Sequence, residues 1–267
     1  MATEHVSPAP RLFAFAIAIL TALAPMRATA AEETTIRIAS EGGHPPFNFL
    51  DATGQLQGFE IDLAHAVCER LKAKCHFIAQ DFTGLLPGLV AGRYDAVFSS
   101  LTITEERKRF VAFTEKYYST RAMFVTSRAK PVTSVKPQDL KGKVIGAKLG
   151  STNAKILQDV YAPAGAEIKL YVTHDEARLD LSRGRVDALI GDKTALLDWL
   201  EKSPIAGCCE IVGEDVTLPS TYSTGIGAAV RKSDGELKAR LDGAIETLRA
   251  DGGYDQIRRK YFSFDPY

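Results

Sequence analysis

The sequence lacks an excess of charge of either sign: it contains 33 Lys and Arg residues and 33 Asp and Glu residues, with no long run of one charge. Proteins that bind nucleic acids or anionic membranes usually carry a basic patch or tail that the polyanion attracts. The even balance of charge therefore argues against nucleic acid and anionic membrane surfaces as partners.

Long apolar segments are also lacking, because a membrane-spanning helix needs about 20 apolar residues. The most apolar segment, residues 12–24, follows Arg11 and precedes the small-x-small motif Ala28-Thr29-Ala30. This order is typical of a signal peptide and its cleavage site. We therefore predict a cleaved signal peptide at residues 1–30 and an exported, soluble protein that begins at Ala31. No Cys stands directly after the cleavage site, which argues against a lipid anchor and favours the periplasm.

Residues 31–267 exceed the size of a typical single domain, about 100–150 residues, which favours two lobes. Short apolar runs alternate with helical patterns in this part of the chain, as in βαβ units around mainly parallel sheets. The pattern predicts strands at 36–40, 76–80 and 94–99 with helices at 60–73 and 83–91, and then strands at 144–149, 168–172 and 186–192 with helices at 152–161, 175–182 and 195–202.

The connections between these two series divide the chain. We expect one crossing between the lobes near Tyr117 and Tyr118 and a return crossing near residues 219–223, after which two C-terminal helices rejoin the first lobe. The predicted fold class is α/β, with residues 31–118 and 222–267 in the first lobe and residues 119–221 in the second.

A short internal repeat supports two similar lobes. Residues 92–97 and 184–189 share the pattern G-R-x-D-A followed by an aliphatic residue. Each copy leads into a strand that ends at polar residues, Ser99 and Ser100 in one case and Asp192 in the other. Ligands of open α/β sheets bind at the carboxyl ends of the strands, so two facing lobes would place these residues in one cleft.

The stretch from Ser99 to Arg107 predicts a strand-to-helix turn that binds a small anion. Thr104 is placed to cap the helix, and the hydroxyl groups and backbone N–H groups of the turn are hydrogen-bond donors. The planar guanidinium of Arg107 matches a carboxylate with two parallel hydrogen bonds. The alternative is an ordinary capped turn with a solvated Arg.

Three further polar clusters follow predicted strands: Glu41-Gly42-Gly43-His44, Gly150-Ser151-Thr152-Asn153, and Asp192. Gly residues let the backbone approach a ligand, and the N–H groups at a helix start favour an anion. A carboxylate at Asp192 would pair with an ammonium group. Together the clusters predict a site that recognises both ends of an α-amino acid.

Two residues point to the side chain of that ligand. Glu41, next to His44, would meet a cationic group, although a solvated loop Glu is the alternative. Phe82 would stack on the ligand, although a core position is the alternative. His65, His76 and His174 have no metal-ligand spacing and are expected at the surface or in packing, so no metal is predicted.

The four cysteines of an exported protein favour disulfides. Cys68 lies late in a predicted helix and Cys75 lies just beyond its end, close enough to form a bridge worth about 2 kcal/mol. Cys208 and Cys209 are adjacent, and their redox state is left open.

Almost all of the predicted mature chain resembles the periplasmic polar amino-acid-binding proteins of ABC importers, bacterial solute-binding protein family 3. The branch that binds lysine, arginine, ornithine or histidine is the most similar. The motifs that carry the resemblance lie at residues 58–63, 94–96, 99–104 with Arg107, 150–152 and 251–254. It implies the two-lobed periplasmic binding protein type II fold with two hinge crossings.

The resemblance also implies roles for residues. Arg107 would bind the ligand α-carboxylate, assisted by the hydroxyl turn and the Gly-Ser-Thr helix start, and Asp192 would bind the α-ammonium group. The Cys68–Cys75 pair, an acidic residue at 41 and an aromatic residue at 82 occur in the same branch. The implied ligand set is Glu41, His44, Phe82, Ser99, Ser100, Leu101, Thr102, Arg107, Leu149, Ser151, Thr152, Asn153 and Asp192, with no catalytic residue, metal or cofactor.

The family pattern is not complete, because His44, Thr102 and Asn153 replace the Tyr, Ser and Gln that are common in the branch. The expected function is a periplasmic, monomeric binding component that closes on a basic L-amino acid and delivers it to the membrane subunits of an ABC permease. One alternative is an opine-binding protein, since Glu41-Gly-Gly is similar to that group. Another is an exported cyclohexadienyl or arogenate dehydratase, with Glu41 and His44 in the general acid role.

Overall fold

The computed structural model describes residues 1–5, 34–216 and 222–267. The predicted signal peptide and its cleavage site lie outside these residues, apart from residues 1–5, as does most of the predicted return crossing at 219–223. Within the described ranges, no helix has the length and apolar character needed to cross a membrane.

The first lobe is built on a five-stranded sheet with the order β5-β1-β6-β13-β7. Strand β1 is parallel to β5 and β6, whereas β13 is antiparallel to both β6 and β7. The strands are β1 (Thr35–Ser40), β5 (Lys74–Ala79), β6 (Ala96–Val97), β7 (Val111–Phe113) and β13 (Ala229–Arg231).

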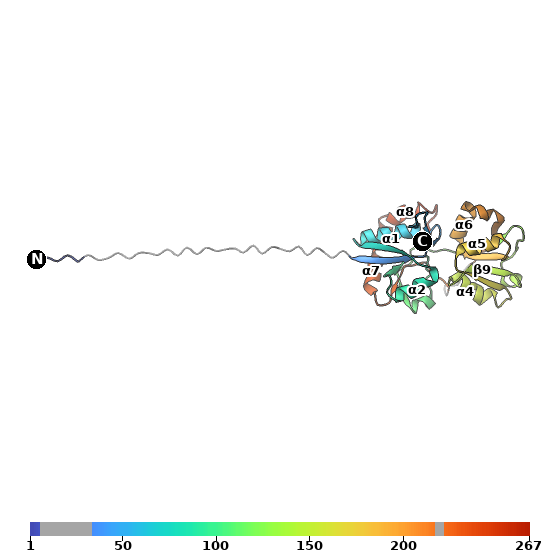
Figure 1. Cartoon of the computed structure of the whole chain (residues 1–267), viewed down its shortest axis with the longest axis horizontal. Helices are drawn as coiled ribbons and strands as arrows, with labels where there is room; N and C mark the ends of the chain where they lie inside the picture. Colours follow the sequence, from blue (N-terminus) through green and yellow to red (C-terminus); the bar gives the residue numbers. More distant parts are fainter. Residues whose placement is uncertain (6–33, 217–221) are drawn as a thin grey trace. The chain divides into compact units, whose positions relative to one another are not determined.

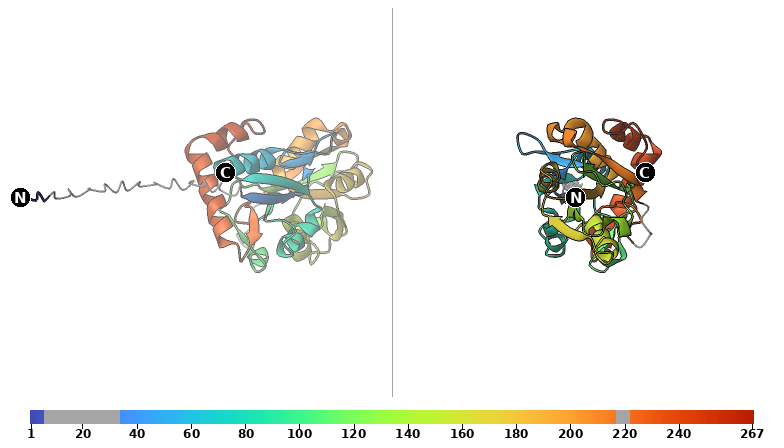
Figure 2. Two further views of the ribbon diagram at one scale, coloured as in Figure 1. Left: turned by 60° about the vertical axis from the view of Figure 1, so that its left-hand side comes forward. Right: turned by 90° about the vertical axis from the view of Figure 1, so that its right-hand side faces the viewer.

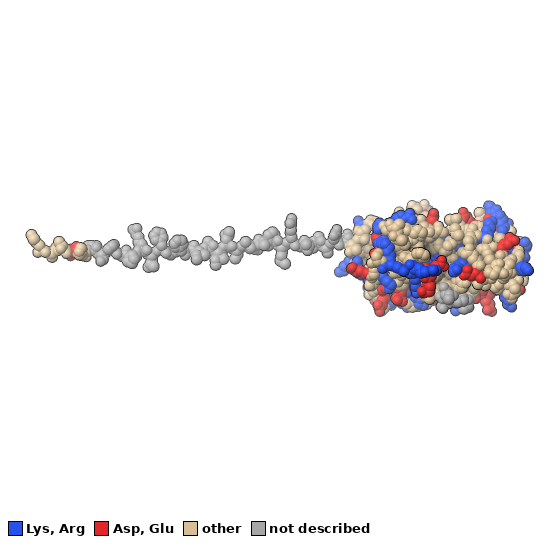
Figure 3. Space-filling view, turned by 90° about the horizontal axis from the view of Figure 1, so that it is seen from below, with Lys and Arg blue, Asp and Glu red and all other residues tan. Residues whose placement is uncertain are grey.

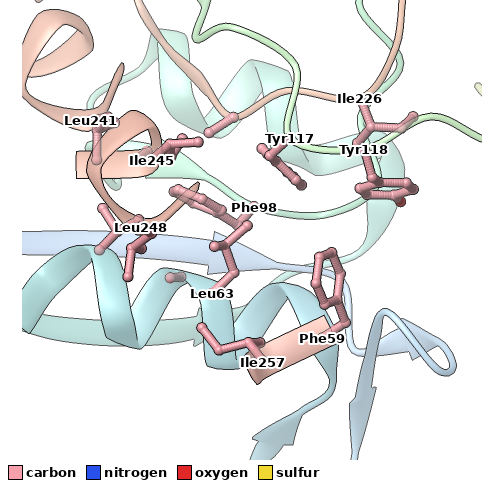
Figure 4. Close-up of a cluster of buried hydrophobic side chains, with 14 of the residues drawn as sticks. Phe59, Leu63, Phe98, Tyr117, Tyr118, Ile226, Leu241, Ile245, Leu248 and Ile257 are labelled. Atoms are coloured by element: carbon pink, nitrogen blue, oxygen red, sulfur yellow. The ribbon is translucent and has the colours of Figure 1, made fainter. Parts of the chain in front are cut away.

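Helices cover both faces of this sheet. Because side chains alternate along a strand, Ile36 and Ile38 of β1 pack into one apolar cluster and Ala39 into another. The first cluster lies under α1 (Phe59–Arg70), α7 (Gly235–Ala250) and α8 (Gly253–Arg258), and the second under α2 (Phe82–Val90). Figure 4 shows the first cluster, in which Phe59 of α1 packs edge-on against Tyr118, and Figure 2 shows the red helices α7 and α8 beside α1.

The second lobe has a five-stranded sheet with the order β10-β9-β11-β8-β12. Strand β9 is parallel to β10 and β11, and β8 is antiparallel to β11 and β12. The strands are β8 (Ala122–Ser127), β9 (Val144–Lys148), β10 (Glu167–Tyr171), β11 (Ala188–Asp192) and β12 (Cys209–Val216). Its helices are α4 (Thr152–Ile156) with a π-helical continuation (Leu157–Tyr161), α5 (His174–Ser182) and α6 (Lys193–Lys202), three of which are labelled in Figure 1.

Smaller elements complete the description. A three-stranded sheet follows β1, and short helices lie in the connections. These elements are β2 (Gly43–His44), β3 (Asn48–Leu50), β4 (Leu56–Gln57), α3 (Glu105–Lys108), η1 (Pro137–Leu140) and η3 (Pro204–Cys208).

The internal repeat has a structural counterpart in both lobes. The Asp of each copy bonds to a neighbouring parallel strand, β1 or β9: Asp95 accepts from the Arg37 backbone N–H at 3.0 Å, and Asp187 accepts from the Val144 N–H at 2.8 Å. In return, the backbone N–H groups of Asp95 and Asp187 donate to the carbonyl oxygens of Arg37 and Val144. The shared motif therefore fixes β6 against β1 in the first lobe and β11 against β9 in the second.

The predicted two-lobed α/β fold is confirmed, with one refinement. Each sheet is mixed, because the strand that enters from a crossing segment, β13 or β8, runs antiparallel to its neighbours. The sequence patterns gave no direction for these two strands. The crossing segments meet beside the first sheet, where Ile226 pairs with Thr102 and Tyr118. The lobe boundaries at residues 118/119 and 221/222 stay a prediction.

The disulfide pattern answers the question left open by the sequence. Cys68 of α1 is bonded to Cys75 of β5, with 6.2 Å between their Cα atoms, as predicted. Cys208 and Cys209 are bonded to each other. No free cysteine occurs among the residues described here.

Candidate ligand-binding site

A polar cavity lies where the carboxyl ends of strands from both sheets meet. Its lining includes all the predicted ligand residues except Leu101 and Leu149. The lining residues are Glu41, His44, Phe82, Ser99, Ser100, Thr102, Arg107, Thr120, Arg121, Ala122, Lys148, Ser151, Thr152, Asn153, His174, Asp192, Ser223 and Ile226.

The turn after β6 is positioned by the buried carboxylate of Glu60. Ser100 has a left-handed backbone, with φ of 50°, and its N–H donates to Glu60 Oε1 at 2.7 Å. The Ser100 hydroxyl donates to Glu60 Oε2 at 2.8 Å, and the Tyr117 hydroxyl donates to Oε1 at 2.5 Å. Burial raises the pKa of Glu60, and these hydrogen bonds oppose the rise. Glu60 therefore positions the turn.

The same carboxylate connects this turn to the loop after β1. Asn48 Nδ2 donates to Glu60 Oε2 at 2.7 Å, and Asn48 Oδ1 accepts from the Gly42 N–H at 3.0 Å. The Glu41 N–H donates to Ser99 Oγ at 2.8 Å. Two polar clusters that are far apart in sequence thus form one rigid wall of the cavity.

Arg107 is placed by the cap predicted from the sequence. The Thr104 hydroxyl accepts from the Arg107 N–H at 3.1 Å at the start of α3. The guanidinium donates from Nη1 to the Thr102 carbonyl at 2.8 Å and from Nη2 to the Gly150 carbonyl of the second lobe at 3.0 Å. Desolvation lowers the pKa of Arg107 to about 10, so the group stays cationic at neutral pH. The five N–H donors of a guanidinium allow further bonds to a carboxylate.

The second lobe contributes hydroxyl groups opposite Arg107. Gly150 has a φ of 74°, a conformation that favours Gly, and it turns the chain from β9 into α4. Ser151 caps α4 by accepting from the Ala154 N–H at 3.0 Å, and its hydroxyl donates to the Lys148 carbonyl at 2.7 Å. Thr152 and Asn153 lie beside it in the cavity lining.

Asp192 supplies a buried carboxylate at the end of β11. Its side chain caps α6, accepting from the Ala195 N–H at 3.1 Å. The residue is 8% exposed, and desolvation raises the pKa of its carboxyl group to about 6, against the lowering effect of the Ala195 hydrogen bond. A cation bound next to Asp192 would favour the ionised form and offset this cost.

Glu41 and Phe82 meet a residue that the sequence reasoning missed. Lys148, the last residue of β9, forms an ion pair with Glu41 across the two lobes. The Lys148 side chain is 3% exposed and that of Glu41 is 10% exposed. Lys148 Nζ also lies 4.5 Å from the centroid of the Phe82 ring, and Arg107 Cζ lies 5.8 Å from it. Burial lowers the pKa of Lys148, and Glu41 opposes this effect.

A pair of histidines closes another side of the cavity. The rings of His44 in β2 and His174 in α5 stack with centroids 4.6 Å apart. Desolvation lowers the pKa of both well below 6.5, and the nearby cationic Lys148 and Arg178 act in the same direction. Both rings are therefore neutral at pH 7. The stacked ring of His174 lines the cavity, which the sequence reasoning did not foresee.

Two predicted ligand residues, Leu101 and Leu149, are not among the residues that line the cavity. Leu101 is 1% exposed and packs in the core cluster under α2, because it follows Ser100 with its side chain on the opposite side of the chain. Leu149 is 40% exposed and lines a neighbouring groove.

The structure adds seven lining residues to the prediction. The position of Lys148 in the sequence indicates a place at the cavity, because it lies near the end of a predicted strand just before the Gly150-Ser151 cluster. Most of the others lie at or next to the crossing segments, whose packing the sequence pattern does not specify. The added residues are Thr120, Arg121, Ala122, Lys148, His174, Ser223 and Ile226. The described part of the chain has no group of three or more His, Cys, Asp or Glu residues that could hold a metal ion.

Comparison with known sequences identifies the family. Residues 36–264 match the profile of the bacterial extracellular solute-binding proteins, family 3. The chain belongs to this family. An L-arginine-binding protein of Pseudomonas aeruginosa is 42% identical over 90% of this chain and 92% of its own length. The lysine/arginine/ornithine-binding periplasmic protein of Escherichia coli is 34% identical over 89% of this chain and 91% of its own.

Solved structures support the same assignment. An ancestral arginine-binding protein bound to arginine superposes on this solute-binding protein with a TM-score of 0.79 and 36% identity, covering 86% of this chain and 99% of the other. These relatives are binding proteins, and this chain is a binding protein rather than an enzyme.

Proposed function

We propose that this solute-binding protein binds a basic L-amino acid, arginine above all, between its two lobes and delivers it to an ABC permease. The observation that carries the proposal is the separation of charges in one cavity. Arg107, from the first lobe, faces the cavity as a cation, and Asp192, from the second lobe, faces it as a buried carboxylate. An α-amino acid has the complementary pair of charges on one carbon atom.

The two ends of the ligand are then bound by residues from both lobes. Arg107, with Ser100, Thr102 and the Ser151 hydroxyl around it, binds the α-carboxylate through charge-assisted hydrogen bonds. Asp192 binds the α-ammonium group, and this ion pair offsets the free-energy cost of burying its ionised carboxylate. Because a ligand bound in this way contacts both lobes, it shifts the population toward the closed form.

The side chain of the ligand extends toward Glu41 and Phe82. A guanidinium or ammonium group pairs with the Glu41 carboxylate, and the Phe82 ring stacks on the aliphatic or planar part. The neutral His44 and His174 rings supply a flat aromatic surface without a competing charge. The names of the relatives, which refer to arginine, lysine, ornithine and the periplasm, favour the same ligand class and compartment for this protein.

A larger ligand is the second candidate, supported by one observation. A groove adjoins the cavity and shares Arg107, Ser151 and Thr152 with it. An opine carries an additional carboxylate substituent that this groove would accommodate. The dehydratase alternative has no such support, because Glu41 is held in an ion pair and His44 is buried and neutral.

A thermal-shift screen of the purified protein tests the proposal. The ligands are arginine, lysine, ornithine, histidine, citrulline, glutamine and octopine, with prephenate and arogenate incubated separately to assay dehydration. A ligand at 100 times its Kd stabilises the folded protein by about 2.7 kcal/mol. We expect the cationic amino acids to give the largest shifts. Stabilisation only by glutamine or octopine, or dehydration of prephenate or arogenate, would contradict the proposal.

A further inference from the structure

The proposed function leaves the most deeply buried charge of the cavity unexplained. The Lys148 side chain is 3% exposed, enters the cavity from the second lobe and pairs with Glu41 of the first lobe. A buried ammonium group is stable only when a counter-charge is close. Glu41 supplies that counter-charge, and it is the same carboxylate to which a cationic ligand side chain would bind.

The aromatic neighbour shows the same overlap. Lys148 Nζ lies 4.5 Å from the centroid of the Phe82 ring, a distance at which a cation is attracted to the ring. Phe82 is the ring on which the ligand side chain is expected to stack. Lys148 therefore occupies both contacts, one ionic and one aromatic, that a ligand guanidinium would make at this end of the cavity.

A second cation cannot join this pair at low cost. Two cations beside one carboxylate repel each other, and the repulsion is strong where water is excluded. Arg107 adds to it, because its Cζ atom lies 5.8 Å from the same ring. A cationic ligand side chain therefore binds Glu41 only when Lys148 leaves it.

We propose that Lys148 is an intramolecular competitor for Glu41 and thereby sets how strongly the cavity prefers cationic over neutral amino-acid side chains. This inference rests on the proposed function. The exposed Asp81 at the start of α2 also favours the charged form of Lys148, so Glu41 is not the sole carboxylate that acts on this ammonium group. The preference for arginine over its neutral isostere citrulline is then smaller than Glu41 alone would produce.

The test compares arginine and citrulline in calorimetric titrations of wild type, Lys148→Met and Lys202→Met. Met keeps an unbranched chain against Phe82 and removes the charge. Lys202 is the matched control, because it lies in α6 of the same lobe, is largely exposed and pairs with Asp198 on its own helix. Lys148→Gln, which retains a hydrogen-bond donor for Glu41, serves if the Met variant does not fold.

We expect Lys148→Met to bind arginine at least tenfold more tightly than wild type while the Kd of citrulline changes by less than threefold, and Lys202→Met to change neither. A general loss of stability would move both ligands together, so the ratio of the two Kd values isolates the competition. If wild type binds arginine and the Lys148 variants bind it equally or more weakly, Lys148 assists binding and the inference falls alone. If wild type binds no basic amino acid, the proposed function falls and takes the inference with it.

Discussion

The carboxylate of Asp192 gives a prediction in which stability and binding move in opposite directions. Desolvation raises its pKa from 3.8 to about 6, which corresponds to about 3 kcal/mol. A carboxyl group whose pKa is raised in the folded protein destabilises that state when ionised. The cost is therefore fully present above pH 6 and disappears as the pH falls below 3.8.

Replacing Asp192 with Asn removes the charge and keeps the oxygen that caps α6 at Ala195. Asn is as good an N-cap as Asp, so the helix is unaffected. We expect Asp192→Asn to be more stable than wild type at pH 7.5 by up to about 3 kcal/mol, with the advantage lost near pH 4. Its affinity for arginine should fall at least thirtyfold, because the α-ammonium group loses its charged partner.

Urea denaturation at pH 7.5 and pH 4 measures the first effect, and calorimetry measures the second. In wild type, ligand affinity should also weaken as the pH falls through 6, because protonated Asp192 no longer attracts an ammonium group. An Asn variant that is less stable than wild type at pH 7.5, or that binds arginine with native affinity, would refute the reasoning about Asp192.

Further predictions concern other parts of the site and its scaffold. Arg107→Ala should weaken arginine binding by about thirtyfold to several thousandfold, from a loss of roughly 2–5 kcal/mol, with an unchanged circular dichroism spectrum; calorimetry showing near-native affinity would remove Arg107 from the site. Reduction of the Cys68–Cys75 disulfide should lower the melting temperature without abolishing ligand binding, because the bridge stabilises the first lobe by about 2 kcal/mol. Free Cys68 and Cys75 thiols in mass spectra of periplasmic material would contradict this prediction. Glu41→Gln should weaken the binding of arginine much more than that of citrulline. Equal losses of affinity for the two ligands in parallel titrations would show that Glu41 does not contact the ligand side chain.

Local sequence patterns were sufficient to predict the turn from Ser99 to Arg107, which forms one wall of the cavity. The run from Ser99 to Arg107 combines hydroxyl residues, a capping Thr and an Arg within one turn, so its geometry depends on neighbours in sequence. The structure shows the predicted Thr104 cap and the predicted strand-to-helix turn. The G-R-x-D-A repeat was equally informative, because its Asp performs the same backbone contact in each lobe.

Local sequence patterns did not predict the contacts between the lobes. The Lys148–Glu41 pair and the His44–His174 stack join residues that are more than 100 positions apart, and nothing in either local pattern names the other partner. The left-handed Ser100 depends in the same way on Glu60 of α1. The sequence therefore indicated many of the residues that line the cavity, but not which of them pair with one another.

The surface agrees with the absence of net charge noted in the sequence. Figure 3 shows Lys and Arg side chains interspersed with Asp and Glu over one face of the molecule. Inside the cavity, by contrast, a lower effective dielectric makes electrostatic interactions between charged groups stronger than at this surface.

We propose that Arg107 and Asp192 recognise the two ends of one basic amino acid. Calorimetric titration with L-arginine, with agmatine, which lacks the α-carboxylate, and with the desamino analogue, which lacks the α-ammonium group, tests it most directly. We predict saturable binding of L-arginine and a loss of at least a hundredfold for each analogue, because a buried charged group of the site is left unpaired. Agmatine or the desamino analogue binding as tightly as L-arginine would contradict the claim.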